Sequence, residues 1–199
     1  MARQWQEDFD ITKYLGTWYE IARTPNYFER NCVANARAQY KLVPEQACTF
    51  TVENSCLYEG DVDHSVLGLA TYDPINQAKL SVTFVPRWLR WLPVVWGGLW
   101  VYLAVLNDTQ THYYYAVAGS PTTSMAWILS RDPQFATSSY YEICVSKLRE
   151  LNYPVDKLIV CPQRWPTSSH TTPSVHQTSS SSNLQSTTDV DTAQVAGEL

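Results

Sequence analysis

Alternating apolar and polar positions dominate the chain up to about residue 130. The clearest run, 16–23, has two sets of side chains: Thr17, Tyr19 and Ile21 on one face, and Trp18, Glu20 and Ala22 on the other. Turns such as Asp73-Pro74-Ile75-Asn76 separate similar runs. The strands that this pattern predicts are 16–23, 34–43, 49–57, 66–72, 79–85, 100–106, 111–118 and 125–130. Eight closely spaced strands favour an all-β fold, an eight-stranded antiparallel up-and-down barrel, over a sandwich.

Two helical segments flank the strands. Near the N-terminus, Asp10 or Thr12 is expected to cap a short turn that closes one barrel end, and Gly16 provides the bend that follows it. After the last long strand, Ser139 and Glu142 form a capping-box pattern that predicts a helix ending near residue 151. One face of this helix carries Tyr141, Cys144, Leu148 and Leu151. We therefore expect the helix to pack on the outside of the barrel, before a short last strand within 154–160.

Composition divides the chain into three parts. Residues 166–199 contain no Lys, Arg, Phe, Trp or Tyr and are rich in Ser and Thr, so we expect a disordered tail there. The barrel domain is expected at 9–165, after an N-terminal extension at 1–8. The net charge of −5 argues against a nucleic-acid partner. No apolar run reaches the length of about 18 residues that a spanning helix needs, and residues 1–8 show no leader-like apolar segment.

The segment 86–100 is the most unusual in the chain because it holds four of the eight tryptophans. Its two prolines and its Gly97-Gly98 pair exclude a regular helix or central strand across it, so a long apolar loop is expected. Trp and Arg together are typical of a bilayer interface, and the interpretations left open are membrane or lipoprotein contact, a lid over the barrel mouth, and a protein interface. The candidate membrane contacts are Arg87, Trp88, Leu89, Arg90, Trp91, Leu92 and Trp96.

Two motifs carry a family resemblance. Gly16-Thr17-Trp18, followed by Tyr-Glu-Ile, resembles the first signature of the lipocalins, and the run from Trp127 to Pro133 resembles their third signature. Over residues 9–162 the chain is most similar to the branch of apolipoprotein D, bacterial outer-membrane lipocalins and plant temperature-induced lipocalins. The resemblance implies that Arg131 stacks over Trp18 at the closed end of the barrel, in a structural role. In the plant proteins of this branch, a comparable hydrophobic loop is associated with membrane attachment.

The resemblance also implies a function. A lipocalin binds and carries a small hydrophobic ligand such as a fatty acid, lysophospholipid, sterol or pigment, without turnover, in a barrel just wide enough for one small molecule. A lipid-modifying enzyme or a protein-interaction module on the same fold are the alternatives. No catalytic residue, metal site or cofactor is assigned, because no motif for one is present. The aromatic residues expected at the cavity wall or rim are Tyr27, Phe28, Phe50, Phe84, Trp88, Trp100 and Tyr102.

The state of the five cysteines, disulfide-bonded or reduced, indicates the cellular compartment of the protein. In the apolipoprotein D branch, a cysteine after the first strand pairs with one past the last strand, so the resemblance implies a Cys32–Cys161 disulfide. Cys48 and Cys56 would lie too far apart on a straight strand and pair only if the chain bends between them. The alternative is that all thiols are reduced. An extracytoplasmic location is favoured, with a cytosolic, membrane-peripheral one as the alternative, and the oligomeric state stays open.

Overall fold

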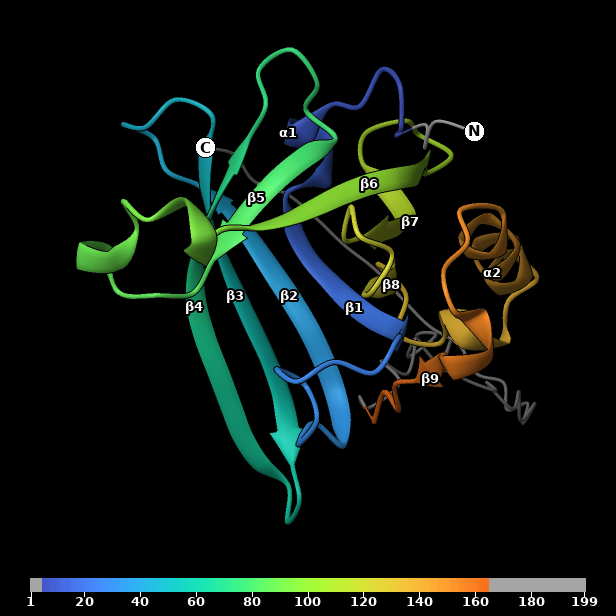
Figure 1. Cartoon of the computed structure of the whole chain (residues 1–199). Helices are drawn as coiled ribbons and strands as arrows, with labels where there is room; N and C mark the ends of the chain where they lie inside the picture. The colour runs from blue at the N-terminus through green and yellow to red at the C-terminus, as the bar shows by residue number, and fades with distance from the viewer. Residues whose placement is uncertain (1–4, 165–199) are drawn as a thin grey trace, which may run out of the picture. The chain divides into compact units, whose positions relative to one another are not determined.

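A computed structural model describes residues 5–164, and the tail expected at 166–199 lies outside the described residues. Strands β2 to β8, then β1 and β9, follow one another in a sheet that closes because β1 also pairs with β2 (Figure 1). All of these pairings are antiparallel, so the expected eight-stranded barrel is confirmed, with one short extra strand. The strands are β1 (Gly16–Arg23), β2 (Ala34–Leu42), β3 (Thr49–Tyr58), β4 (Val62–Tyr72), β5 (Lys79–Thr83), β6 (Gly97–Leu106), β7 (Tyr113–Gly119), β8 (Ala126–Ser130) and β9 (Ile159–Val160).

The connections divide into two ends. At the closed end, α1 (Ile11–Tyr14) begins at Asp10, whose carboxylate accepts a hydrogen bond of 2.9 Å from the Thr12 amide. Gly16 follows with φ +94°, a left-handed conformation that costs glycine little. At the open end lie two long segments, which we name the lid loop (24–33) and the aromatic loop (84–96). No helix within residues 5–164 is long and apolar enough to cross a membrane.

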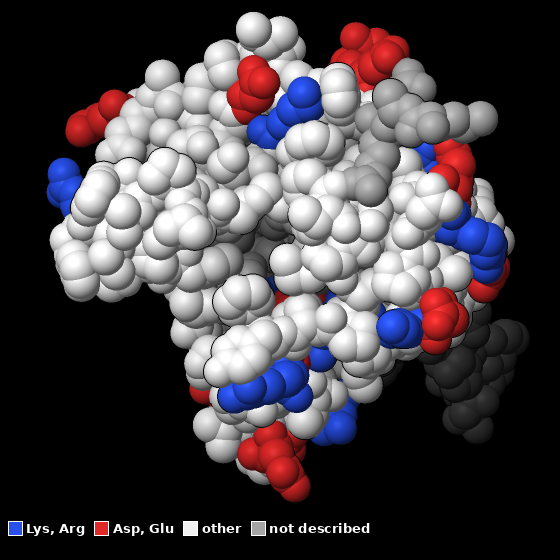
Figure 2. Space-filling view, in the orientation of Figure 1, with Lys and Arg blue, Asp and Glu red and all other residues white. Residues whose placement is uncertain are grey.

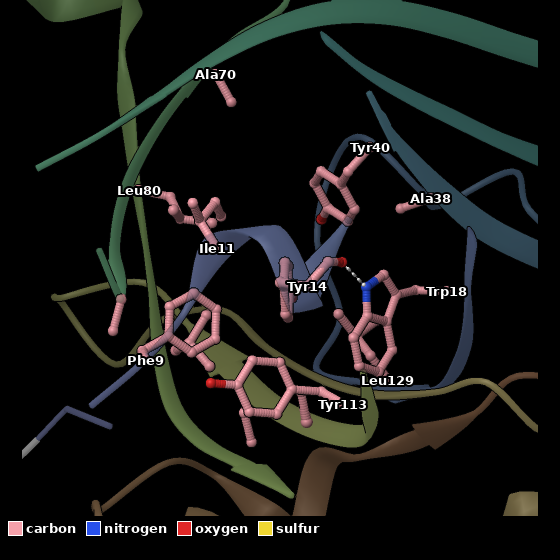
Figure 3. Close-up of a cluster of buried hydrophobic side chains, with 14 of the residues drawn as sticks. Phe9, Ile11, Tyr14, Trp18, Ala38, Tyr40, Ala70, Leu80, Tyr113 and Leu129 are labelled. Carbon is pink, nitrogen blue, oxygen red and sulfur yellow. Dashed lines mark hydrogen bonds between the residues drawn. The ribbon is translucent and has the colours of Figure 1, made fainter. Parts of the chain in front are cut away.

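The closed end is packed around Trp18. Its ring is fully buried, and its indole N–H donates to the Tyr14 carbonyl at 2.7 Å (Figure 3). The Arg131 guanidinium lies 3.8 Å from the centre of the same ring, which is the stacking that the resemblance implies. The interior cluster around it contains Phe9, Ile11, Tyr14, Trp18, Ala38, Tyr40, Phe50, Val52, Ala70, Ala78, Leu80, Val101, Ala104, Tyr113, Ala116 and Leu129.

A second apolar cluster lies between the barrel wall and α2 (Tyr140–Glu150). Cys144 and Leu148 are fully buried there, so the expected packing of this helix is confirmed. The capping box is wrong, because Ser139 already has helical backbone angles and its side chain makes no cap hydrogen bond. The helix follows directly on a 3-10 turn, η3 (Phe135–Thr137). The remaining turns are η1 (Arg87–Leu89), η2 (Pro93–Val95) and η4 (Val155–Lys157).

The segment 159–164 fills a seam in the barrel. Pairing between β1 and β2 stops at Tyr19 opposite Arg37, and beyond that point β1 pairs with β9 instead. The Gln163 amide bridges the gap by donating to the carbonyls of Glu20 at 2.8 Å and of Ala36 at 3.0 Å. The barrel is therefore completed by residues from the far end of the described chain.

Candidate functional site

The open end is an entrance bordered by the lid loop and the aromatic loop. Figure 2 shows a hollow on this face, surrounded mainly by uncharged side chains. Four aromatic rings project from the two loops, and each is about three-quarters exposed. They are Tyr27 (70%), Phe28 (74%), Trp88 (71%) and Trp91 (77%). Exposed aromatic rings of this size are characteristic of interaction surfaces.

Polar contacts hold the aromatic loop in shape. The Trp96 indole donates to the Arg90 carbonyl at 2.8 Å, and the Arg90 Nε donates to the Val85 carbonyl at 3.0 Å. Leu89 and Leu92 are half-buried beneath it, whereas Trp88 and Trp91 point to solvent. The irregular segment is shorter than expected, because β6 already begins at Gly97.

Among the seven aromatic candidates, the structure separates interior from exterior positions. Phe50 is fully buried in the interior cluster, and Phe84 is 38% exposed where the aromatic loop begins. The assignment of Trp100 and Tyr102 to the cavity is wrong. Tyr102 packs on Tyr153 in the cluster beneath α2, and Trp100 packs against the same cluster.

A β-bulge in β1 changes which side chains face inward at the open end. Residues three apart on a regular strand point to opposite faces. Because the register with β8 shifts between Glu20 and Ala22, Glu20 and Arg23 instead share the inner face, and their side chains form an ion pair of 2.8 Å. Arg23 lies opposite Trp127, which packs against the interior cluster.

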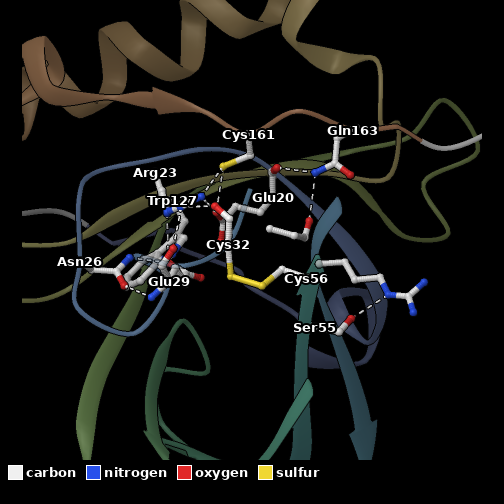
Figure 4. The surroundings of a disulfide bond; sticks show 12 residues. Glu20, Arg23, Asn26, Glu29, Cys32, Ser55, Cys56, Trp127, Cys161 and Gln163 are labelled. Atoms are coloured by element: carbon white, nitrogen blue, oxygen red, sulfur yellow. Dashed lines mark hydrogen bonds and ion pairs between the residues drawn. A yellow bond between two sulfur atoms is a disulfide. The ribbon is translucent and has the colours of Figure 1, made fainter. Parts of the chain in front are cut away.

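Glu20 and Arg23 belong to a buried polar group that we name the mouth cluster: Glu20, Arg23, Glu29, Trp127 and Cys161 (Figure 4). The lid loop contributes Glu29, whose carboxylate accepts from the Trp127 indole at 3.2 Å and from the Asn26 side chain. The Cys161 thiol lies 2.9 Å from the carboxylate of Glu20 and from the guanidinium of Arg23. Both charged groups of β1 are almost fully buried, with 5% and 6% of their surfaces exposed.

Every nitrogen of the Arg23 guanidinium has an acceptor. Nη1 donates to Glu20 at 2.8 Å and to the Cys161 sulfur at 2.9 Å. Nη2 donates to the carbonyls of Glu29 at 2.9 Å and of Cys32 at 3.5 Å, and Nε forms a 3.6 Å ion pair with the Glu29 carboxylate. A guanidinium has five N–H donors, and here five acceptors surround it.

The Glu20 carboxyl group holds a proton near neutral pH. Burial and the neighbouring Glu29 carboxylate raise the pKa of Glu20 to about 8, although Arg23 acts in the opposite direction. Glu20 is therefore largely protonated at pH 7. In the sequence, the shared parity of Glu20 with Trp18 is the signal that points to the interior.

The disulfide joins Cys32 to Cys56, with their Cα atoms 5.7 Å apart, so the expected Cys32–Cys161 pair is wrong. The lid loop runs across to β3, and this brings Cys32 to the inward-facing Cys56. Cys161 instead directs its thiol into the mouth cluster, where burial and Glu20 raise its pKa far above the usual range. Cys48 and Cys144 are also free thiols, and burial beneath α2 raises the pKa of Cys144 to about 12. Within residues 5–164, no group of His, Cys, Asp and Glu side chains is arranged to hold a metal ion.

Comparisons with known proteins agree with this architecture. Residues 9–163 match the family model of the lipocalin-like domain. The chain is 35% identical over 167 residues to temperature-induced lipocalin-1 of Arabidopsis thaliana, covering 82% of this chain and 85% of that protein. It is 33% identical over 137 residues to apolipoprotein D of Mus musculus (64% of each chain), and 30% identical over 154 residues to the outer membrane lipoprotein Blc of Citrobacter freundii (76% and 78%). Among solved structures, insecticyanin of Manduca sexta superimposes with a TM-score of 0.58 at 23% identity, covering 81% and 84%, which reflects the shared fold.

Proposed function

This chain belongs to the lipocalin family, whose members typically bind small hydrophobic ligands, and from that premise we propose that it binds and carries such a ligand without turnover. A fatty acid, lysophospholipid, sterol or pigment has suitable chemistry. We further propose that the open end docks on a membrane or lipoprotein surface through the aromatic loop, so that cargo enters without crossing bulk water. The loading surface and the binding cavity are then parts of one entrance.

The observation that carries this proposal is the apolar interior beneath the open end. Tyr40, Phe50, Leu80 and Tyr113 supply large apolar surfaces in the interior cluster, and transfer of a ligand's hydrocarbon from water to such surfaces supplies affinity. Small residues of the barrel wall belong to the same cluster. The small residues of this cluster are Ala38, Ala70, Ala78, Ala104 and Ala116.

Membrane docking is supported by the uneven distribution of exposed apolar residues. The lid loop and the aromatic loop project the four rings described above and Val94, which is 87% exposed. At the closed end, the exposed large apolar residues of the described chain are Leu42 and Ile75. Arg87 and Arg90 accompany the exposed tryptophans, and arginine and tryptophan together suit the headgroup region of a bilayer.

The carrier function is tested by extracting the purified full-length protein with organic solvent and identifying the released molecules by mass spectrometry. We expect one class of hydrophobic molecule at a stoichiometry near one per barrel, chemically unchanged after incubation with the protein. Displacement of the fluorescent probe N-phenyl-1-naphthylamine by that molecule should then give a saturable curve. A protein that neither releases a hydrophobic molecule nor binds the probe would contradict the proposal.

Membrane docking needs its own experiment. Flotation with vesicles of phosphatidylcholine and phosphatidylserine should recover the wild-type protein, and the Trp88→Ser, Trp91→Ser double variant should lose most of this association. Ile75→Ser is the matched control, because it removes a side chain that is 95% exposed at the closed end. Probe binding in solution should be the same for all three proteins. Equal flotation of the double variant and the wild type would exclude docking through the aromatic loop.

A further inference from the structure

We propose that the mouth cluster makes this barrel select ligands whose polar end is uncharged or cationic and donates hydrogen bonds, and discriminate against long-chain carboxylates. Suitable ligands are long-chain alcohols, monoacylglycerols, sterols and long-chain amines. The inference rests on the proposed carrier function and narrows its ligand class, because an ionised fatty acid becomes a poor ligand.

The position of the cluster relates it to the polar end of a ligand. The interior cluster around Trp18 and Tyr40 lies toward the closed end and is suited to a hydrocarbon tail. Glu20 shares the inner face of β1 with Trp18 but lies nearer the open end, and Arg23 lies at the end of the strand. A ligand that inserts its tail first therefore has its polar end at the level of the mouth cluster.

The cluster has no spare cationic donor for a carboxylate. Arg23 is the only Lys or Arg side chain buried within residues 5–164, and five protein acceptors already surround its guanidinium. A ligand carboxylate could bind Arg23 only by displacing Glu20, Glu29, the Cys161 sulfur or a lid-loop carbonyl. A displaced carboxylate would then be buried without its cation, which is strongly unfavourable.

The acidic groups of the mouth cluster also disfavour a ligand carboxylate. Two carboxyl groups face one guanidinium in the cluster, so a ligand carboxylate would be a third acidic group at this depth. Because the Arg23 guanidinium is already surrounded by acceptors, a ligand carboxylate would add a buried negative charge without a free cation beside it, which is unfavourable. A hydroxyl or ammonium group adds no negative charge, and it can donate to the carboxyl oxygens of Glu20 and Glu29.

The arginines of the two loops do not replace this missing partner inside the barrel. Arg30 lies over the ring of Tyr27, which is itself 70% exposed, at 4.0 Å from the ring centre. Arg90 donates its Nε to the Val85 carbonyl within the aromatic loop. Arg87 is exposed in η1. These cations belong to the loops, where they suit the phosphates of a membrane surface.

The test compares three ligands with one hydrocarbon chain: dodecanoic acid, 1-dodecanol and dodecylamine. Each displaces N-phenyl-1-naphthylamine from the full-length wild-type protein at pH 7.4, below the concentration at which the acid forms micelles. We expect the alcohol and the amine to bind at least about tenfold more tightly than the acid. Because this comparison uses the wild-type protein, it does not depend on the folding of any variant.

The Glu20→Gln, Glu29→Gln double variant tests the cause. Removal of both carboxylates leaves Arg23 as an uncompensated cation, so the preference should reverse toward dodecanoic acid. The matched control is the Glu45→Gln, Glu142→Gln double variant, which loses two exposed carboxylates and should keep the wild-type preference.

The outcomes separate the inference from the function beneath it. Equal or tighter binding of the acid by the wild-type protein would overturn the selectivity and leave the carrier function intact. An unchanged preference in a folded Glu20→Gln, Glu29→Gln variant would overturn the role of the mouth cluster. If none of the three ligands and no probe binds, the carrier function fails and the inference fails with it.

Discussion

The two ends of the barrel each place an arginine beside a tryptophan, but they satisfy the arginine with different acceptors. At the closed end, Arg131 lies over Trp18 and donates to the carbonyls of Tyr14, Leu15, Thr17 and Tyr113. At the open end, Arg23 lies opposite Trp127, and its partners include the carboxyl groups of Glu20 and Glu29.

The two kinds of acceptor differ in their response to pH and redox conditions. Backbone carbonyls do not titrate, and although burial lowers the pKa of Arg131 to about 10, this group stays charged at neutral pH. The arrangement at the closed end therefore does not depend on pH near neutrality. At the open end, a proton on Glu20 and a disulfide on the lid loop both affect the arrangement, so acidity and redox conditions act there.

Substitution of the two tryptophans should reveal the largest difference in stability between the two ends. Trp18→Ala removes a fully buried ring, its indole hydrogen bond and the arginine stack, so we expect a loss of about 3–5 kcal/mol in the free energy of unfolding. Trp127→Ala removes a half-buried ring and should cost less than half as much. Urea unfolding followed by circular dichroism gives both values. Equal losses would mean that the closed end is not the more rigid one.

The disulfide should contribute the next largest effect. It closes a sequence separation of 24 residues, so the Cys32→Ser, Cys56→Ser double variant should lose about 3 kcal/mol of stability and be cleaved faster by protease within the lid loop. Cys48→Ser, at the closed end, is the control and should behave as the wild type. Mass mapping of peptides without reductant should recover Cys32 joined to Cys56. A peptide joining Cys32 to Cys161 would contradict the pairing.

A pH dependence of stability is also expected from the open end. The pKa of Glu20 rises from its ordinary value of 4.5 to about 8, so the folded protein retains a proton that the unfolded chain releases. The contribution of Glu20 to stability is therefore greatest below pH 4.5, falls as the pH rises to about 8, and is constant above that value. Glu20→Gln should remove this slope when urea midpoints are compared between pH 5 and 9. A variant with the wild-type slope would show that another group titrates.

Much of the barrel follows from the sequence because it depends on local patterns. Alternation predicts the strands, and turn residues predict most of the connections. The motifs around Trp18 and Arg131 imply the stack at the closed end. These features require only the side-chain period of a strand and the chemistry of neighbouring residues.

The side chains that face inward at the open end could not be predicted in the same way, because β-bulges determine which face each side chain occupies. One bulge between Glu20 and Ala22 places Glu20 and Arg23 on one face, and a register shift between Val101 and Leu103 interrupts β6 at Tyr102. An inserted residue reverses the parity of everything beyond it, and alternation alone does not reveal where the insertion lies. The partner of Cys32 likewise depends on the path of the lid loop, which no local pattern specifies.

The seam filled by residues 159–164 has a consequence for synthesis on the ribosome. Gln163 closes the gap against Glu20, a residue 143 positions earlier in the chain. Translation proceeds from the N-terminus, so β1 and β2 emerge long before the segment that joins their diverging ends. Contacts of such large sequence separation slow folding. The gap between the diverging ends of β1 and β2 therefore stays uncovered until residues 159–164 have left the ribosome, which is after all eight long strands have been made.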